Sequence, residues 1–298
     1  MSYDREMELL PVSGWQAPPS YFISIGGLGY LTLSWLMYNI SLYLPEGEGM
    51  DQFQGARFVP IDTAIPEGYD LPPQDWARNR LFRLQGDLNH IIQEVNQGLY
   101  PGISDFYQDT QKAREARQVV GDLGPGAGTT RPFGRIGFFY NWEPFYERLQ
   151  EELRRDITGG RMRFGGDFQI QAGNVRQFVI ISSLAGGTGS SCFFDVAATL
   201  QLLRQNAYPH ETWKILGVFT LADVLASDKK VHQEFHRTRM KANSYAALKE
   251  LNFFLSGQPF EARYGRNGFS SIELSNREER DTLFDLVFLA DTPNQDNQ

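Results

Sequence analysis

The stretch that most constrains the fold of this chain is residues 178–200, which read FVIISSLAGGTGSSCFFDVAATL. An apolar run typical of a buried β-strand stops at a cluster of glycines, and an amphipathic helical pattern follows it. A strand, a glycine-rich loop and a helix in this order can hold an anion, because the loop amides and the positive end of the helix face it together. The sequence therefore predicts a phosphate-binding loop here.

The residues of this loop suit close contact with a phosphate. Its glycines have no Cβ atom, so the backbone can turn sharply and approach a ligand. Its hydroxyl groups add hydrogen-bond donors, and one of its two serines is predicted to cap the following helix. A Walker A loop has a lysine after its glycines, and this loop has none. Its glycine spacing also differs from the G-x-G-x-x-G of dinucleotide-binding loops. The loop consists of Ala185, Gly186, Gly187, Thr188, Gly189, Ser190 and Ser191.

A second glycine-rich turn lies near the N-terminus. Residues 21–25 are predicted to form a buried strand and residues 30–44 a largely buried helix, rather than one transmembrane helix, because glycines interrupt the uncharged stretch early. The spacing of this turn suits a pyrophosphate, yet taken alone it could equally begin a dinucleotide-binding βαβ unit. The turn contains Gly26, Gly27, Leu28 and Gly29.

The loop at 185–191, A-G-G-T-G-S-S, resembles the G-G-G-T-G-[ST]-G loop of the tubulin and FtsZ family. Ala185 and Ser191 stand where that family usually has glycine. The branch that the chain resembles is the divergent bacterial tubulin-like domain proteins. The resemblance implies GTP or GDP bound at the carboxyl edge of the sheet, with Mg²⁺ beside it. It also implies head-to-tail self-association into cytoskeletal filaments.

The order of predicted elements agrees with that fold. Strands near residues 21, 57, 178, 214 and 285 alternate with helices, which indicates a three-layer α/β sandwich with a mostly parallel central sheet. We expect residues 1–20 to form an extended arm and residues 21–298 a single tubulin-like nucleotide-binding domain. Within it we predict helices at 75–97, 107–120, 140–157 and 229–255, a loop at 221–228, a hairpin within 159–174 and a small lobe at 256–282.

Three further residues are candidates for the phosphate side of the site. Asp62 ends the predicted strand at 57–62, and the carboxyl end of a parallel strand faces the ligand of an open α/β sheet. Asp62 could hold a magnesium-bound water or simply cap a turn. Arg131 and Arg135 lie in a segment that resembles the third phosphate-side segment of tubulin-like domains, where guanidinium groups suit a terminal phosphate. They could equally be surface arginines.

The resemblance also implies ribose and base contacts later in the chain. An asparagine suits guanine because its amide donates and accepts at once. Each candidate could instead be an ordinary helix-surface or turn residue. The candidates are Asp223, Arg237, Arg239, Asn243 and Asn294.

Composition limits the class of partner and the compartment. A net charge of −8 argues against a broad nucleic-acid surface, which needs a basic face. The single cysteine, Cys192, excludes an internal disulfide and fits a reducing, cytoplasmic compartment. The first eleven residues are acidic and mixed, so we expect no signal peptide.

Hydrolysis is expected to need residues outside this chain. In tubulin and FtsZ it is completed by an acidic loop of the neighbouring subunit, beyond a long helix that follows the last strand. The chain ends at Gln298, before such a helix. We therefore expect the N-terminal binding portion of a longer protein, or a truncated family member.

Two other functions remain open at this stage. One is an NAD- or FAD-dependent oxidoreductase of the Rossmann type, in which the turn at Gly26 binds the pyrophosphate and Asp51 or Asp62 binds the ribose. It leaves the loop at 185–191 unexplained. The other is a scaffold whose glycine loops no longer bind nucleotide, which the departures at Ala185 and Ser191 keep open.

Overall fold

The computed structural model describes residues 16–44, 49–50, 53–64, 71–123, 127, 129–155, 161–163, 167–170, 175–226, 234–275, 277 and 281–291. Its centre is a six-stranded sheet in the order β11-β8-β7-β2-β3-β4, and every neighbouring pair of strands is parallel. The five predicted strands are present, so the predicted α/β fold is confirmed. The strands are β2 (Ser20–Ile25), β3 (Ala56–Asp62), β4 (Phe82–Arg83), β7 (Val175–Ser183), β8 (Thr212–Thr220) and β11 (Leu286–Ala290).

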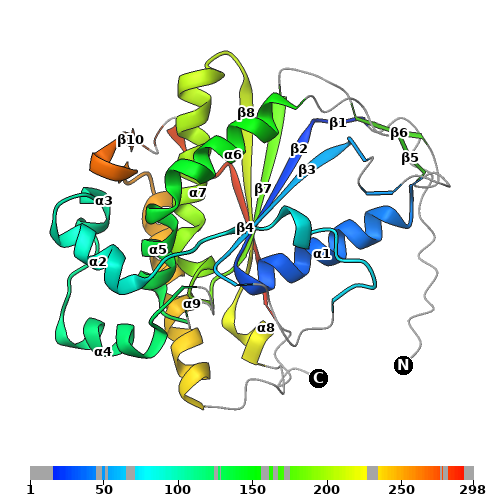
Figure 1. The fold of residues 1–298 in the computed structure, drawn as a ribbon. Coiled ribbons are helices and arrows are strands. Elements are labelled where there is room, and N and C mark those ends of the chain that lie inside the picture. The colour runs from blue at the N-terminus through cyan, green and yellow to red at the C-terminus, as the bar shows by residue number, and fades with distance from the viewer. Residues whose placement is uncertain are drawn as a thin grey trace.

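Helices cover both faces of the sheet and make three layers (Figure 1). Helix α1 (Gly26–Ser41) packs its Leu33 and Met37 on one face, against Phe58, Val179 and Ile181. The alternate residues of the same strands point to the other face. There they pack against α5 (Arg131–Tyr140), α6 (Trp142–Arg154), α7 (Gly189–Ala207) and α9 (Glu234–Leu255). This alternation explains the near-continuous apolar strands of the sequence, because a parallel sheet is buried on both faces.

Helix α7 lies at the centre of the second layer. Every residue from Gly189 to Arg204 is buried, and Phe194 packs edge to face against Phe254 of α9, with ring centroids 5.0 Å apart. A helix that is buried all round lies in a core. The loop at 185–191 is therefore attached to a helix that is buried in the core of the domain.

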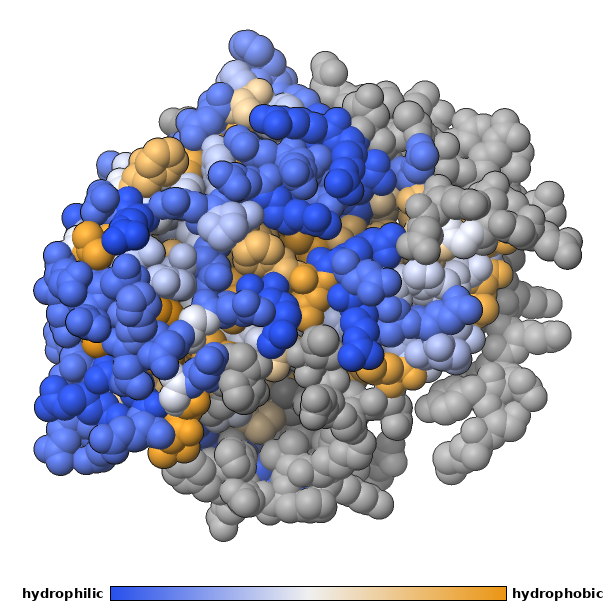
Figure 2. All heavy atoms as spheres, viewed as in Figure 1, coloured by the Kyte–Doolittle hydropathy of each residue, from blue (hydrophilic) through white to orange (hydrophobic). Residues whose placement is uncertain are grey.

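Smaller elements decorate this frame. Helices α2 (Leu88–Asn96), α3 (Pro101–Ser104) and α4 (Gln111–Val120) precede α5, and an antiparallel pair, β9 (Phe260–Tyr264) and β10 (Ser270–Leu274), forms the lobe predicted at 256–282. The hairpin predicted within 159–174 is β5 (Arg161–Arg163) with β6 (Asp167–Ile170), and β1 (Gln16–Ala17) pairs with β6. Hydrophilic residues dominate the surface over α2, α4 and α6 (Figure 2).

The helix predicted at 30–44 is α1, which begins at Gly26, so the glycine-rich turn at 26–29 is its first turn. The structure corrects four further details of the prediction. Residues 75–97 do not form one helix: a 3-10 turn, η1 (Arg78–Arg80), and β4 come first, and α2 starts after Asp87, whose carboxylate accepts from the His90 amide at 2.8 Å. The helix expected from 107 begins at Gln111, because Thr110 caps it. Residues predicted as a loop after β8 form α8 (Ala222–Ala226).

The fourth detail is the buried face of α9. Helical spacing in the sequence predicts that Ala242 and Tyr245 lie on the buried face of this helix. Both are exposed, whereas Asn243, Ser244 and Ala247 are buried. Asn243 is buried because α9 packs against the glycine-rich loop there, where its amide donates to the Ala185 carbonyl oxygen. A second 3-10 turn, η2 (Arg266–Gly268), joins β9 to β10. None of the described helices is long and apolar enough to cross a membrane.

Candidate functional site

The two glycine-rich turns leave the sheet at the point where its strand order reverses. From β2 the chain runs through α1 to β3 on one side, and it later returns to β7 on the other side of β2. In open α/β sheets the crevice outside the carboxyl ends at such a point is the usual ligand site. In Figure 1 this edge is the lower end of the sheet, where α1 and α8 begin.

The glycines let the two turns touch. Gly26 has φ +76°, and a Cβ atom on it would lie 3.0 Å from the amide nitrogen of Gly189. A Cβ atom on Gly189 would lie 2.8 Å from the carbonyl oxygen of Ser183 and 3.0 Å from that of Ile25. Gly26 needs a left-handed backbone, whereas the three glycines of the later loop, Gly186, Gly187 and Gly189, do not have positive φ. In the later loop, Gly187 and Gly189 allow close approach rather than unusual dihedral angles.

The carbonyl groups of the later loop are held from behind. Asn243 donates its side-chain amide to the carbonyl oxygens of Ala185 at 2.9 Å and Gly186 at 3.4 Å. Ser190 Oγ also donates to the Gly186 oxygen, and Ser191 Oγ donates to the Gly187 oxygen at 2.7 Å. The prediction that one of these serines caps α7 is therefore wrong. The N-cap position is Thr188, and its side chain makes no capping hydrogen bond.

Most of the backbone amide groups of the same loop, unlike its carbonyl groups, have no hydrogen-bond partners among the described residues. Within the part of the chain that the structure describes, no acceptor is found for the backbone N–H groups of residues 186–190. The first amides of α1, at Gly26, Gly27 and Leu28, also lack partners among the described residues, as expected at a helix start without a side-chain cap. Two sets of unpaired amides thus meet where Gly26 contacts Gly189. Such an arrangement fits an anion, because helix starts carry partial positive charge.

A buried carboxyl group lies beside this cradle of amides. Asp62 ends β3, and its Oδ1 accepts from the Thr63 amide at 2.7 Å. The hydroxyl of Thr63 lies 3.4 Å from that of Thr188 in the loop. Burial raises the pKa of Asp62 to about 6, against the opposing effect of the hydrogen bonds from Thr63 and Thr188. No cluster of three or more potential metal ligands is found among the described residues.

The pKa of Asp62 predicts a pH-dependent stability. Because the folded state binds the proton more tightly than the unfolded state, this group stabilises the fold most below pH 4 and loses that contribution as the pH rises to about 6. Two pKa units correspond to roughly 3 kcal/mol. We expect Asp62→Asn to be more stable than the wild type by roughly 2–3 kcal/mol at pH 7.5 and equal to it near pH 4, in urea unfolding. A difference that does not change with pH would contradict this.

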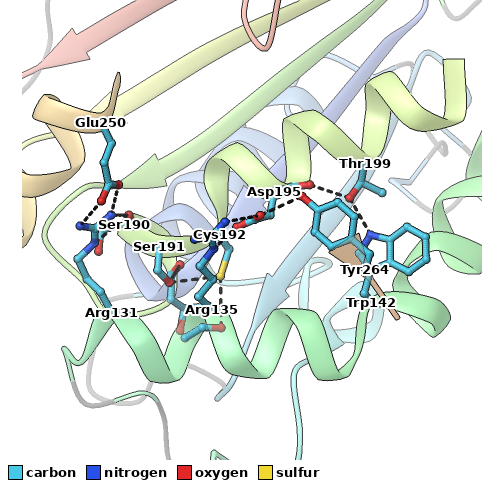
Figure 3. A network of polar contacts seen from close by, with 12 residues as sticks. Arg131, Arg135, Trp142, Ser190, Ser191, Cys192, Asp195, Thr199, Glu250 and Tyr264 are labelled. Carbon is cyan, nitrogen blue, oxygen red and sulfur yellow. Dashed lines mark hydrogen bonds and ion pairs between the residues drawn. The ribbon is translucent and has the colours of Figure 1, made fainter. Parts of the chain in front are cut away.

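The structure brings Arg131 onto the loop and turns Arg135 away from it (Figure 3). Arg131 donates to the carbonyl oxygen of Ser190 at 2.8 Å and forms a bidentate ion pair with Glu250. Arg135 donates to both carboxylate oxygens of Asp195, at 2.8 and 3.0 Å, and its guanidinium lies 4.5 Å from the ring centroid of Phe106. Both guanidinium groups therefore have protein partners in this structure.

The candidates for ribose and base lie on different elements. Arg239 reaches Thr130 Oγ1 at 3.4 Å, and Arg237 is exposed on α9. Asp223 is on α8 and lies 3.4 Å from the Lys241 ammonium group. Asn243 is buried, and its amide also donates to the Thr129 carbonyl at 2.9 Å. Asn294 lies outside the described residues.

Two residues that the sequence analysis did not single out support the loop. A Cβ atom on Gly134 would lie 2.7 Å from the Gly187 oxygen, so α5 packs directly on the back of the loop. Asp195 is fully buried in α7 and holds Arg135. The sequence did carry a signal for each of them. Gly134 is the glycine inside R-P-F-G-R, and Asp195 is the one acidic residue in the apolar run 192–203. Cys192 is no nucleophile, because burial raises the pKa of its thiol to about 12.

The sequence model of a family described as "Tubulin like" matches residues 22–298. Among solved structures, a GTPγS-form protofilament of TubZ from Bacillus thuringiensis serovar israelensis aligns at 14% identity and a TM-score of 0.41, over 92% of this chain and 48% of that one. A GTPγS-bound protofilament of CetZ2 from Haloferax volcanii aligns at 14% identity and a TM-score of 0.33, over 80% and 58%. The chain thus spans about half the length of these structures. No curated protein sequence matches it.

Proposed function

The chain belongs to the tubulin-like family, and from that premise and its own geometry we propose that it binds a guanine nucleotide, GTP or GDP, in the cradle formed by its two glycine-rich turns. The observation that carries this proposal is the run of amides at residues 186–190, which have no acceptor among the described residues although the loop lies between buried helices. Buried backbone N–H groups are nearly always paired. A phosphate group is the acceptor that this position and polarity fit best.

The two departures from the family loop do not obstruct the cradle. Ala185 packs its methyl group against Ala222 and Met240, and its carbonyl oxygen accepts from Asn243. Ser191 directs its hydroxyl back to Gly187, on the side of the loop away from the unpaired amides. Neither side chain competes with a phosphate. This favours a binding loop over a scaffold that has lost its nucleotide.

The other assignments that we propose are finer. Gly26, Gly27, Leu28 and Gly29 would contact the phosphates together with the later loop. Asp62 would hold Mg²⁺ through a water molecule, since magnesium on a nucleotide takes most of its ligands from phosphate and water. Asp223, Arg237 and Asn294 would contact ribose or base. Because their donor groups already have protein partners, we propose that Arg131, Arg239 and Asn243 position the loop rather than touch the ligand. We leave Arg135 out of the phosphate contacts.

The role of Asn243 can be tested directly. We expect Asn243→Ala to weaken GTP binding about tenfold and to lower the free energy of unfolding by roughly 1–3 kcal/mol, because buried carbonyl groups lose their donor. Ser244→Ala is the matched control, since the Ser244 hydroxyl is buried without a hydrogen-bond partner in the described part of the chain. It should leave both quantities unchanged. Equal behaviour of the two variants would contradict a positioning role.

Assembly and hydrolysis are proposed from family membership alone. We propose that subunits associate head to tail in the cytoplasm and that a neighbouring subunit supplies the group that activates water. The described residues offer no candidate base beside the cradle other than Asp62, whose carboxyl group accepts from Thr63. Binding is therefore the better supported half of the proposal.

Calorimetric titration of the chain with GTP, ATP and NAD tests the proposed function. We expect GTP to bind more tightly than ATP and NAD not to bind. Preference for NAD would support the oxidoreductase alternative. Absence of GTP binding at millimolar concentration, with a folded protein by circular dichroism, would overturn the proposal.

A further inference from the structure

A cavity lies behind the loop at 185–191, on the face of the sheet that α5, α7 and α9 cover. Its volume is about 780 Å³, and its walls come from the start of α5, from α7, from α9 and from the segment that enters β9. We call it the α5–α9 pocket. Pockets of a few hundred to a thousand Å³ are of the size that binds small molecules. The residues with unpaired amides do not line it, so it is separate from the cradle.

One wall of the α5–α9 pocket is aromatic. Phe254 packs edge to face against Phe194, Phe253 and Phe260, with ring centroids 5.0, 5.3 and 5.3 Å apart. Phe253 keeps 52% of its surface exposed although it lines the hollow. Offset and edge-to-face packing of rings favours a flat aromatic guest. The wall therefore fits a planar aromatic molecule.

The polar groups of the pocket favour an acidic guest. Three arginines and two glutamates line it, but Arg135 is already paired with Asp195, so Arg131 is the group that can take an acid. The Arg131 guanidinium donates to the Ser190 carbonyl, which holds it in place, and it forms an ion pair with the Glu250 carboxylate. The Arg131 side chain is 16% exposed and that of Glu250 is 45% exposed, so the arginine is fixed while the acid can turn into solvent. Figure 3 shows Glu250 of α9 reaching Arg131 at the start of α5, beside Ser190 at the start of α7.

From these features we propose that the α5–α9 pocket is a second ligand site, which takes a planar aromatic molecule bearing one carboxylate or similar acidic group. The ring lies on the wall formed by Phe253 and Phe254. The acidic group replaces Glu250 on Arg131, whose planar guanidinium binds a carboxylate through two parallel hydrogen bonds. This proposal does not depend on the identity of the nucleotide.

The test uses 1-anilinonaphthalene-8-sulfonate as an anionic aromatic probe and N-phenyl-1-naphthylamine as its neutral counterpart, without nucleotide. We expect saturable fluorescence enhancement, with displacement by 1-naphthoate but not by 1-naphthalenemethanol. Phe253→Ala should weaken probe binding at least fivefold. Tyr245→Ala, which removes a ring that is 66% exposed on the same helix outside the pocket, should leave it unchanged. Glu250→Gln should tighten binding of the anionic probe about threefold or more, and not that of the neutral one.

Three results would overturn the proposal. The first is probe binding that Phe253→Ala leaves intact, and the second is equal displacement by the acid and the alcohol. The third is competitive displacement by GTP, which would assign the pocket to the nucleotide site. Because the probe is titrated without nucleotide, a chain that fails to bind GTP can still pass this test. The two proposals therefore fail separately.

Discussion

Replacing Asp195 by alanine is expected to lower the free energy of unfolding by about 3–4 kcal/mol. Its carboxylate is fully buried, and it accepts two hydrogen bonds from Arg135 and one from the Tyr264 hydroxyl at 2.9 Å (Figure 3). Removal of one partner from a buried ion pair costs about 3–5 kcal/mol, because the other charge stays behind unpaired. We expect the lower part of this range, since the Arg135 side chain is 28% exposed. Urea unfolding measures the difference.

The control is a second arginine–aspartate pair in the same domain. Arg263 and Asp105 also form a two-point ion pair, but both side chains are about half exposed. Exposed pairs contribute little to stability, so Asp105→Ala should leave the unfolding midpoint unchanged. Asp195→Asn, which keeps the shape of the side chain, should fall between the wild type and Asp195→Ala. Equal effects of the two alanine variants would show that the buried network does not stabilise α7.

The strands were predictable because each is a local apolar run long enough to be recognised. Within the central sheet the exception is β4, which consists of Phe82 and Arg83 alone and exists because Phe82 pairs with Ile61 of β3. Strand formation of this kind is decided by the neighbouring strand and not by local propensity. The helical spacing of Leu84, Leu88, Ile91 and Ile92 therefore suggested a helix that starts too early.

The site was predictable only in its local parts. Glycine clusters at residues 26–29 and 185–191 can be recognised without knowledge of the fold. The direction of the Ser190 hydroxyl could not be predicted, because a serine at a helix start can either accept from an amide or donate to a carbonyl group four residues back. Nor could the contact between Gly134 and the loop, since it depends on which helix packs there.

Strand order alone does not separate the proposed function from a Rossmann oxidoreductase. Counted along the chain, the central strands lie in the order 3-2-1-4-5-6, which is also the Rossmann order. Asp62 even ends the second strand, where a ribose-binding acid would lie. However, the hydroxyl of Thr63, which is bonded to Asp62, lies 3.4 Å from that of Thr188, so this carboxyl group belongs with the later loop. The later loop and the family match therefore favour the proposed function over the oxidoreductase.

Gly186→Asp is expected to reduce GTP affinity at least a thousandfold, which corresponds to about 4 kcal/mol. A Cβ atom on Gly186 would meet no atom of the described residues within 4 Å, and the residue does not need positive φ, so the fold should tolerate the change. The new carboxylate would lie at the loop whose unpaired amides are proposed to bind the phosphate. The carboxylate and the phosphate are both negative, and like charges in one site repel by several kcal/mol. Calorimetric titration with GTP measures the loss.

Gly186→Asn separates charge from size, because asparagine has nearly the same volume as aspartate without its charge. We expect this variant to lose about tenfold in affinity, and both variants to keep the thermal midpoint of the nucleotide-free wild type. If Gly186→Asp bound GTP within threefold of a wild type that itself binds, the amides at 186–190 would not be the phosphate contacts. The nucleotide would then have to rest on the turn at Gly26 alone, as in a Rossmann site, and the second turn would have to be explained as packing against α5.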